Sequence, residues 1–375
     1  MSSLLVEIVE IDDIQKHPNA DKLDVATVKG WFCIVGRGQF QKGDKCLYIP
    51  IDSVLPEDLV NKLFKDSKIR PVRGRIRTVK IRGQVSQGLV VRLEDAGLDG
   101  HKVGENVADL LKIAKYEPPV QMSPASNAHA TSKKQTNSNF RKYTEIENFK
   151  NHVNVFEEGE QVSITEKIHG SNFRCGYVKT EVNTLWKKIK KLFGKLPEFE
   201  FVYGSHNVQL QDLSRPRPAY YSELKKNIYW EAIEKYDLRS KLKDLEDEIG
   251  SVVVYGEVYG DGIQKGYTYG HKTGERSLVV FDVMVDGRYL DVHEMKSFCK
   301  LFNLPTAPEL YQGPFDKATA KSLTEGCSVL EPTQKIREGI VIKPLHEENC
   351  PSVGRKVLKW VSDEYLLLKE NSDWH

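Results

Sequence analysis

One stretch without apolar periodicity divides the 375 residues into two parts. Residues 117–140, EPPVQMSPASNAHATSKKQTNSNF, are rich in Pro, Ser, Asn, Thr and Gln. Such a composition cannot build a packed core and is typical of a flexible linker. The sequence therefore predicts a domain at 1–116, a linker at 117–140 and a second domain at 141–375.

Composition excludes several classes of protein. Hydrophobic residues make up 39% of the chain, and no apolar run reaches membrane-spanning length. The N-terminus MSSLLVEIVEIDD carries acids where a signal peptide needs basic residues. Six scattered cysteines form no C-x-x-C pair, which argues against a zinc site and a disulfide scaffold. We therefore expect a cytoplasmic protein with no membrane partner, and we expect a monomer.

The first domain has the pattern of a small β-barrel. LLVEIVEI, VATVKGWFCIVG and KCLYIPIDSVL predict short strands separated by Gly or Asp. A basic run follows at 68–82, in which Arg73, Arg75 and Arg77 alternate with uncharged residues. On a strand these three guanidiniums would share one face, which suits either RNA phosphates or plain solvation.

Two segments of this domain resemble a known module. HPNADKLDVATV at 17–28, followed by IRGQVSQGL at 81–89, is similar to the OB-fold of tRNA-binding domains attached to aminoacyl-tRNA synthetases. The resemblance implies an OB barrel that is able to bind RNA.

In the second domain, charged residues interrupt apolar strand patterns. EQVSITEKIHGSNFRCGYV predicts a strand that ends at Lys167, a turn at 168–172 and a second strand, on which Phe173, Cys175 and Tyr177 share one face. RSLVVFDVMVDGRYLDV predicts a hairpin around Asp286 and Gly287. Charges inside other apolar strands are Glu257 in VVVYGEVYG, Glu338 and Lys343 in REGIVIKP, and Lys356 and Lys359 in GRKVLKWVS. Buried charges are costly unless they are paired or used. A pocket that binds a polyanion would explain all of these charged residues together. Lys167 taken alone would also suit a lysine at the edge of a β-hairpin.

In this order the motifs resemble those of covalent nucleotidyltransferases, the superfamily of DNA ligases, RNA ligases and mRNA capping enzymes. K-x-H-G followed by Ser-Asn, with YGEVYGDGIQK, looks most like the RNA ligases that join 3′-hydroxyl to 5′-phosphate ends. A subset of RNA ligases also carries an OB domain upstream. The resemblance implies an α+β fold, in which an OB-like β-barrel precedes a nucleotidyltransferase domain built on antiparallel sheets.

The resemblance implies an ATP-dependent RNA ligase, acting in RNA repair on nicked duplexes or broken RNA ends. Lys167 would attack the α-phosphate of ATP to form lysyl-AMP, AMP would pass to the RNA 5′-phosphate, and a 3′-hydroxyl would displace it. Since lysine attacks only when neutral, the pKa of Lys167 must fall. A divalent ion, Mg²⁺ or Mn²⁺, would neutralise the triphosphate, with Glu338 as its first ligand.

The resemblance also assigns roles to other residues. Lys356 and Lys359 would bind the α-phosphate and lower the pKa of Lys167, although their odd spacing favours Lys359 alone. The same odd spacing separates Glu338 from Lys343 and counts against Lys343. The remaining candidates are Glu166, Gly170, Asn172 and Glu257 for the nucleotide, Phe281 for stacking on adenine, His169 for the RNA 5′ end, His206, which replaces a frequent arginine, and Asp291.

Two other functions stay open. A capping-type guanylyltransferase would share the lysine chemistry but use GTP. A non-catalytic RNA-binding protein would keep the OB module and carry the motifs as relics. Labelling with ATP or GTP distinguishes the three.

Two further segments predict helices. TLWKKIKKLFGKL at 184–196 is basic and has apolar residues at helical spacing. It would suit RNA or a membrane surface, but we favour a packed surface helix. The segment at 220–250 predicts a long amphipathic helical region that serves as scaffold.

Overall fold

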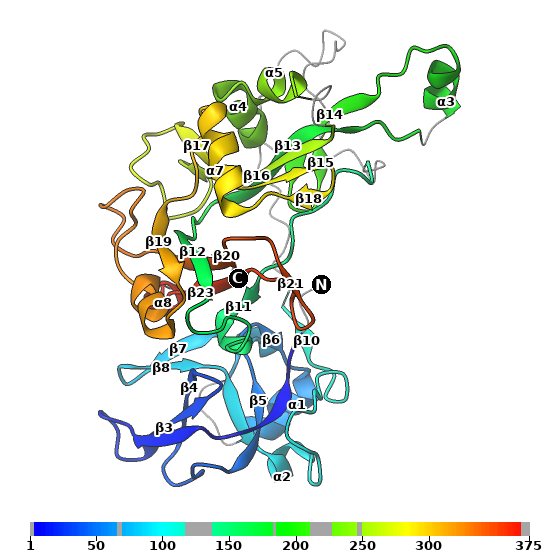
Figure 1. Cartoon of the computed structure of the whole chain (residues 1–375). Coiled ribbons are helices and arrows are strands. Elements are labelled where there is room, and N and C mark those ends of the chain that lie inside the picture. The colour runs from blue at the N-terminus through cyan, green and yellow to red at the C-terminus, as the bar shows by residue number, and fades with distance from the viewer. Residues whose placement is uncertain are drawn as a thin grey trace. The chain divides into compact units, whose positions relative to one another are not determined.

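The computed structural model describes residues 4–65, 70–116, 137–182, 185–210, 227–245 and 250–368. Contacts divide the chain into two compact units (Figure 1). Unit 1 comprises Met1–Pro119, Glu147–Val153 and Val361–His375, and unit 2 comprises Val120–Ile146 and Asn154–Trp360. Most of the predicted linker lies outside the described residues. Among the residues described, no helix combines the length and apolar character needed to cross a bilayer.

Unit 1 is built from short antiparallel strands. One sheet has the order β1 (Glu7–Glu10), β5 (Lys45–Ile49), β9 (Leu89–Arg92), and a second has the order β2 (Asp13–Lys16), β3 (Leu23–Val28), β4 (Trp31–Gly36). The pairs β7 (Thr78–Ile81) with β8 (Gln84–Gln87) and β10 (Ala114–Lys115) with β6 (Ser53–Val54) are also antiparallel. Its other elements are α1 (Glu57–Leu63), η1 (Val72–Gly74), α2 (Leu93–Ala96), β11 (Glu147–Asn148), η2 (Phe149–Asn151) and α9 (Asp363–Leu366). Burial alternates strictly along β3, as expected of a strand with one face on the core.

A buried lysine ties distant segments into unit 1. Lys150 lies in η2, outside the predicted first domain, and is only 4% exposed. Its ammonium lies 3.0 Å from Asp363 Oδ1, donates to Gln87 Oε1 at 3.1 Å and sits 4.4 Å from the centre of the Trp31 ring. A buried ammonium needs such partners, and here they come from three parts of the chain.

The predicted row of arginines on one strand face is wrong. Val72–Gly74 forms a 3₁₀ turn, in which Arg73 has φ 51° and Gly74 has φ 74°. These left-handed conformations end the extended backbone that side-chain alternation requires. As a result Arg73 is exposed, Arg75 is buried and Arg77 is half-buried.

Arg75 has a structural partner, so its replacement by alanine is expected to lower the free energy of unfolding. Its Nη2 lies 2.7 Å from Asp52 Oδ1, and the guanidinium stacks 3.5 Å from the centre of the Tyr116 ring. Loss of one partner of such an ion pair should cost about 2 kcal/mol, whereas the exposed Arg73→Ala control should cost less than about 0.5 kcal/mol. Urea unfolding of the full chain measures both. Equal unfolding midpoints for the two variants would contradict the structural role of Arg75.

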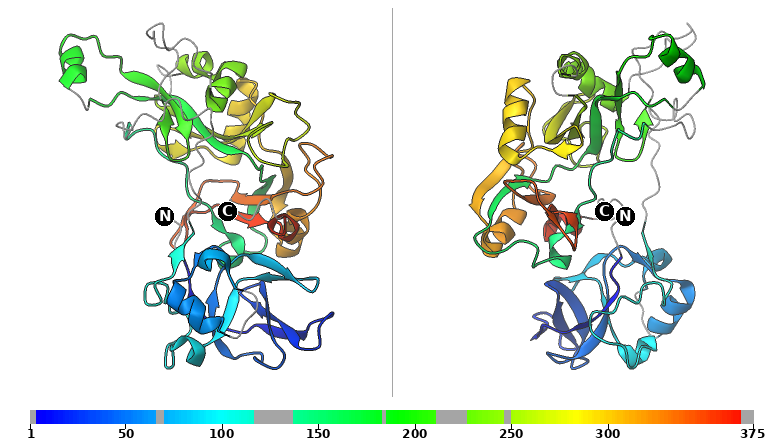
Figure 2. Two further views of the ribbon diagram at one scale, coloured as in Figure 1. Left: turned by 180° about the vertical axis from the view of Figure 1, so that it is seen from behind. Right: turned by 45° about the vertical axis from the view of Figure 1, so that its right-hand side comes forward.

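Unit 2 is an α+β domain with two principal sheets (Figures 1 and 2). One sheet has the order β15 (Gln209–Leu210), β14 (Phe199–Ser205), β13 (Ser171–Lys179), β16 (Val252–Gly260), β17 (Arg276–Val285), β18 (Arg288–Tyr289). In the other, β23 (Leu358–Val361), β20 (Gly339–Pro344), β12 (Gln161–Glu166) and β19 (Glu309–Pro314) follow one another. β21 (Asn349–Cys350) pairs with β22 (Gly354–Arg355), and the helices are α3 (Leu185–Leu192), α4 (Ile228–Lys235), α5 (Leu238–Lys243), α7 (Val292–Leu301) and α8 (Lys317–Thr324).

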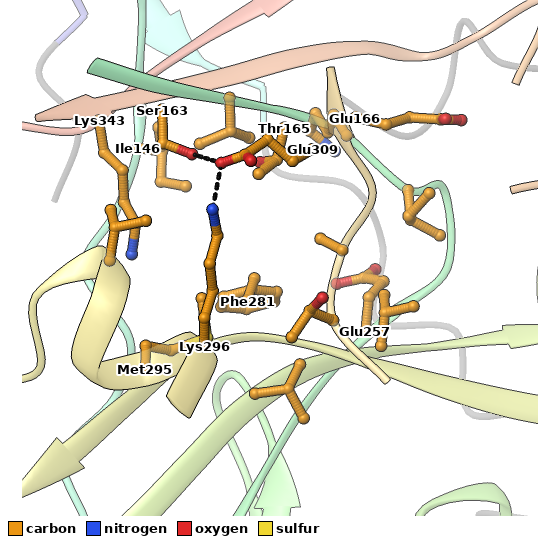
Figure 3. A pocket seen from close by; sticks show the side chains of 18 of the residues that line it. Ile146, Ser163, Thr165, Glu166, Glu257, Phe281, Met295, Lys296, Glu309 and Lys343 are labelled. Atoms are coloured by element: carbon orange, nitrogen blue, oxygen red, sulfur yellow. Dashed lines mark hydrogen bonds and ion pairs between the residues drawn. The ribbon is translucent and has the colours of Figure 1, made fainter. Parts of the chain in front are cut away.

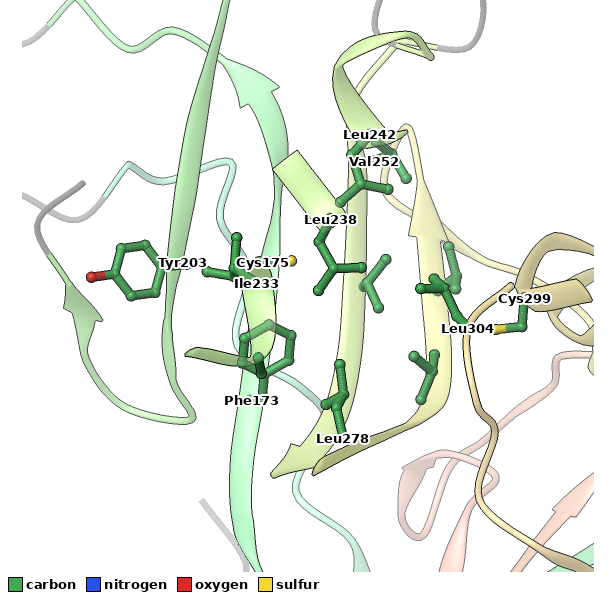
Figure 4. Packing of buried hydrophobic residues seen from close by; sticks show 14 of the residues in the cluster. Phe173, Cys175, Tyr203, Ile233, Leu238, Leu242, Val252, Leu278, Cys299 and Leu304 are labelled. Atoms are coloured by element: carbon green, nitrogen blue, oxygen red, sulfur yellow. The ribbon is translucent and has the colours of Figure 1, made fainter. Parts of the chain in front are cut away.

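The main core of unit 2 lies on one face of the first sheet (Figure 4). The alternation of Phe173, Cys175 and Tyr177 predicted a shared strand face, and all three side chains are buried in this cluster. Leu238 and Leu242 of α5 pack against them. Burial of these apolar side chains fixes the faces of β13 and thereby the direction of the residues that precede it.

Local turn signals explain where elements of unit 2 begin and end. The predicted hairpin at Asp286 and Gly287 is confirmed, since both residues have positive φ and connect β17 to β18. The helical region predicted at 220–250 is confirmed for its described part. Two short helices, α4 and α5, meet at Asp237, whose φ of 49° interrupts the helix. The rest of that prediction lies outside the described residues.

Candidate active site

A pocket of unit 2 is lined by residues from both of its principal sheets and from α7 (Figure 3). Its apolar wall includes Val279, Val280, Met295 and Ala307. It brings together six of the sequence-predicted site residues, namely Glu166, Lys167, Asn172, Glu257, Phe281 and Lys343. A mostly apolar pocket with a few converging polar groups is the usual form of a small-molecule site.

Lys167 follows β12 directly and is held at the pocket by a carboxylate. Its backbone N–H donates to the Gly339 carbonyl at 2.9 Å, and its Nζ lies 2.6 Å from Glu338 Oε1. Burial alone would lower the pKa of Lys167, but Glu338 and Glu257 raise it above the ordinary value. The pKa of Lys167 is therefore raised where a fall was predicted, and the lysine carries its proton.

Glu338 lies beside Lys167 and Lys343 lines the pocket, although the two residues are an odd number of positions apart. Glu338 precedes β20 and is buried beside Lys167, while Lys343 lies within β20 and lines the pocket. Between them, Gly339 has φ 150°, outside the usual conformations of strand residues. The objection to Lys343 is therefore wrong, because side-chain alternation holds only inside the regular strand.

His169 and Gly170 form the turn after Lys167. The His169 ring is buried, packs edge-on against Tyr267 and has its Nδ1 3.7 Å from Glu338 Oε2. Burial lowers the pKa of His169 to about 4, despite Glu338, so the imidazole is neutral at pH 7. Gly170 allows a close backbone crossing, since a Cβ there would lie 2.3 Å from the Val258 carbonyl oxygen.

Asn172 and Glu257 lie opposite each other on β13 and β16, and both line the pocket. Within the described part of the chain, Asn172 Oδ1 is buried and has no hydrogen-bond partner. Burial raises the pKa of Glu257 to about 8, although Lys167 opposes the shift. A buried, unsatisfied acceptor is costly, and together these groups present hydrogen-bonding capacity that suits hydroxyls of a ligand.

The raised pKa of Glu257 makes the stability of the ligand-free protein depend on pH. A group with a raised folded-state pKa contributes stability that is fully present below its unfolded value, 4.5, and is lost as pH rises through about 8. Glu257→Gln removes this titration. The melting temperature of the wild type is therefore expected to fall relative to Glu257→Gln between about pH 4.5 and pH 8, with no further divergence above pH 8. Calorimetry of both proteins measures this difference, and parallel melting curves would contradict the raised pKa.

A buried charge network supports one wall of the pocket. Asp282 is fully buried and accepts hydrogen bonds from Tyr143 at 2.9 Å and from Arg355 at 2.7 Å, with Lys343 Nζ at 3.3 Å. Burial alone would raise the pKa of Asp282, but Lys343 and Arg355 hold it below its ordinary value. Asp282 thus stays ionised and orients Lys343 and Tyr143, which both line the pocket.

Besides His169, Gly170 and Glu338, which lie close to Lys167, four sequence-predicted residues of unit 2 do not line the pocket. Lys356 lies 2.7 Å from Glu160 Oε1 and 3.2 Å from Glu348 Oε2, and Lys359 is half-buried on β23. His206 is half-buried beyond the end of β14. Asp291 caps α7 in a capping box and accepts from the backbone N–H of Glu347 at 2.7 Å, which is a structural role.

Sequence reasoning missed a connected group of three polar side chains in the pocket, Ser163, Lys296 and Glu309. Ser163 Oγ donates to Glu309 Oε1 at 2.9 Å, and Lys296 Nζ lies 2.5 Å from the same oxygen (Figure 3). They come from β12, β19 and α7, so only the tertiary structure places them together. The serine inside VSITE was the one local signal, and a single polar residue in a strand is too common to identify a site.

A family model described as RNA ligase matches residues 160–361, which is more than half of the chain and includes Lys167, Glu257, Glu338 and Lys359. The chain belongs to the RNA ligase family. An OB-fold domain model matches residues 5–93 of this RNA ligase. The predicted α+β fold class, with an N-terminal OB-fold domain and mostly antiparallel sheets, is thereby confirmed.

Solved structures agree with this family. A mutant of Naegleria gruberi RNA ligase with ATP and Mn has a TM-score of 0.71 and 22% identity, covering 97% of this RNA ligase and 98% of that chain. The same enzyme with PPi has a TM-score of 0.71 and 23% identity, with the same coverage of both chains. An apo mutant has a TM-score of 0.72 and 22% identity, covering 97% of each chain. At this identity the likeness establishes the fold.

Curated sequences give a shorter match. Phenylalanine–tRNA ligase beta subunits of Bacillus cereus and Bacillus thuringiensis are 28% identical to this RNA ligase over 109 residues. That match covers 28% of the chain and spans only 12% of the length of these relatives.

Proposed function

We propose that this RNA ligase joins 3′-hydroxyl and 5′-phosphate RNA ends in RNA repair, through a lysyl-AMP at Lys167 and an RNA-adenylate. The observation that carries the proposal is the position of Lys167 at a pocket shared with Phe281, Asn172 and Glu257, inside the family match. Solved structures of the Naegleria ligase with ATP and with AMP support a nucleotide as the ligand. The proposal keeps the expectation of a monomeric, cytoplasmic enzyme.

The lining residues suit an adenine nucleotide. Phe281 offers a ring for stacking on the base, and Asn172 and Glu257 offer hydrogen bonds to ribose hydroxyls. Glu166 uses one oxygen to accept from the Val329 N–H at 2.7 Å, and its other oxygen is buried without a partner among the described residues. That oxygen would accept from the amino group of adenine, whereas guanine carries a carbonyl at this position. This contact favours ATP over GTP.

The residues around Lys167 also fit a divalent ion. Glu338 presents carboxylate oxygens, the donors that Mg²⁺ and Mn²⁺ prefer. Since the described residues contain no cluster of three or more His, Cys, Asp or Glu suited to a metal, water and phosphate oxygens would complete its ligands. When bound, the ion supplies positive charge against the triphosphate. Separation of Glu338 from Lys167 would lower the pKa of the lysine and make it a nucleophile.

Residues outside the pocket are proposed for the RNA. The neutral imidazole of His169, two residues after Lys167 in the chain, would act when the RNA 5′-phosphate takes up AMP. His206 and the lysines Lys356 and Lys359 stay candidates for phosphate contacts. The exposed Arg73 and half-buried Arg77 stay candidates for binding RNA from unit 1, in contrast to Arg75.

Labelled nucleotide tests the proposal directly. The purified protein is incubated with ATP labelled at the α-phosphate and Mg²⁺ or Mn²⁺, then run on a denaturing gel. We expect label on the protein with ATP, and its release when nicked RNA is added and sealed. Label from GTP alone would favour the capping reaction. No label, from protein whose intact mass excludes bound AMP, would favour the non-catalytic RNA-binding alternative.

A further inference from the structure

A basic helix of unit 2 exposes apolar side chains that no other described residue covers. We call residues 185–195, comprising α3 and the turn after it, the α3 arm. Leu192 is 83% exposed and Phe193 is 69% exposed. The expectation of a packed surface helix is therefore wrong for these side chains. Figures 1 and 2 show α3 at the far end of the β13–β14 hairpin, away from the other helices of unit 2.

The α3 arm is an ordered extension of that hairpin. The strand pairing reaches Lys179 opposite Phe199 and continues with a bond from the Thr180 N–H to Glu198 O at 2.8 Å. Lys187 Nζ donates to both carboxylate oxygens of Glu200 on β14, at 3.0 and 3.1 Å, which ties the helix to the sheet. The arm is therefore held at a defined place relative to β13.

The α3 helix ends in a defined backbone motif next to the exposed side chains. Gly194 has φ 63°, its N–H donates to Lys191 O at 3.1 Å, and the Lys195 N–H donates to Lys190 O at 2.9 Å. These two bonds form a Schellman motif, which ends a helix with a glycine in the left-handed region. Phe193 is the last residue before this glycine, so its ring is presented at the tip of the arm.

The charge of the α3 arm has one sign. Its lysines are Lys187, Lys188, Lys190, Lys191 and Lys195, and no Asp or Glu occurs between residues 182 and 197. Lys188 and Lys191 are exposed and lie one turn apart on the helix, and Lys195 is exposed directly after its end. Lysines near a helix C-terminus also stabilise the helix dipole. That effect does not account for an exposed leucine and phenylalanine beside them.

We infer that the α3 arm binds the RNA substrate at a distance from the joint, with lysines on phosphates and Phe193 stacked on a base. The inference rests on the proposed function and extends it. Cationic side chains with an accessible aromatic ring are the combination that holds single-stranded nucleic acid. β13 carries Asn172 at one end and leads to the arm at the other, about 23 Å further along at the rise of a strand. An RNA strand that starts at the pocket therefore reaches the arm several nucleotides away.

The test compares two variants with the same change of net charge. Lys188→Gln, Lys191→Gln and Lys195→Gln together alter the arm, and Lys272→Gln, Lys300→Gln and Lys317→Gln together alter exposed lysines elsewhere in unit 2. Binding of nicked RNA with single-stranded tails is measured by fluorescence anisotropy over a range of salt. The arm variant should lose about tenfold or more in affinity at low salt, and its log–log salt slope should be shallower by about 2. The control should bind as the wild type does, and both should take up AMP normally.

Phe193 distinguishes stacking from burial of apolar surface. Phe193→Leu keeps an apolar side chain but removes the ring, so it should weaken binding of the tailed RNA by about tenfold, as Phe193→Ala should. Equal binding by wild type and Phe193→Leu would contradict the stacking contact.

Three further results separate the alternatives. Unchanged affinity and salt slope in the arm variant would overturn the inference. A second result would also overturn it: the two proteins bind RNA equally, and only the wild type floats with vesicles containing 30% phosphatidylserine. The arm would then bind a membrane. A wild type that takes no label from ATP, and whose intact mass excludes bound AMP, would refute the proposed function, while the arm inference would still stand on the anisotropy data.

Discussion

Replacing Lys167 with alanine is expected to abolish covalent labelling by ATP and to lower RNA joining by at least about a thousandfold. Lys167 is the nucleophile of the proposed reaction and directly follows β12. The other lysines that line the pocket, Lys296 and Lys343, lie on α7 and β20. Labelling on a denaturing gel and sealing of nicked RNA with ATP measure the two effects. Joining of RNA that already carries a 5′-adenylate should survive better, since that substrate bypasses the lysyl-AMP.

Lys300→Ala is the matched control, because Lys300 is an exposed lysine of α7 and does not line the pocket. It should label and seal at the wild-type rate. Circular dichroism must show that Lys167→Ala is folded, since its loss leaves Glu338 and Glu257 without their cation. Wild-type labelling by folded Lys167→Ala would refute the assignment of the nucleophile.

Replacing Glu338 with alanine should have the second largest effect, slowing labelling by about a hundredfold or more. This buried carboxylate lies 2.6 Å from Lys167 Nζ and 3.7 Å from His169 Nδ1, so it governs the charge around the nucleophile. Glu338→Gln keeps the shape of the side chain but not its charge. If Glu338 helps to hold the metal, both variants should need a higher Mn²⁺ or Mg²⁺ concentration for half-maximal labelling.

Glu158→Gln, an exposed carboxylate of unit 2, serves as the control and should leave the metal requirement unchanged. A Glu338→Gln variant that is slow at every metal concentration, without a shift in the midpoint, would assign Glu338 to orienting Lys167 alone. Wild-type rates for both Glu338 variants would contradict either role.

Local patterns were enough to predict the elements that carry the site. The strand ending at Lys167, the shared face of Phe173, Cys175 and Tyr177, and the hairpin at Asp286 each depend on neighbours in the chain. A period of two residues decides which side chains face a core, and a positive φ decides where a hairpin turns. The motif order around Lys167 also predicted the family that the comparison established.

Local patterns failed where a distant residue or a special backbone conformation intervened. The arginine row was broken by the left-handed Gly74, and Arg75 was drawn inward by Asp52. The spacing argument against Lys343 failed because the strand starts only after Glu338. Lys150 joined unit 1 through partners that are distant in sequence.

By itself, therefore, the sequence determined the strand faces around Lys167 and the RNA ligase motifs, because each depends on residues close together along the chain. Only the tertiary structure decided which groups meet. It placed Glu338 against Lys167, raised the pKa of Glu257 to about 8 and joined Ser163, Lys296 and Glu309 in one pocket. Ion pairs and desolvation depend on distances between atoms, and the fold sets those distances between residues far apart in the chain.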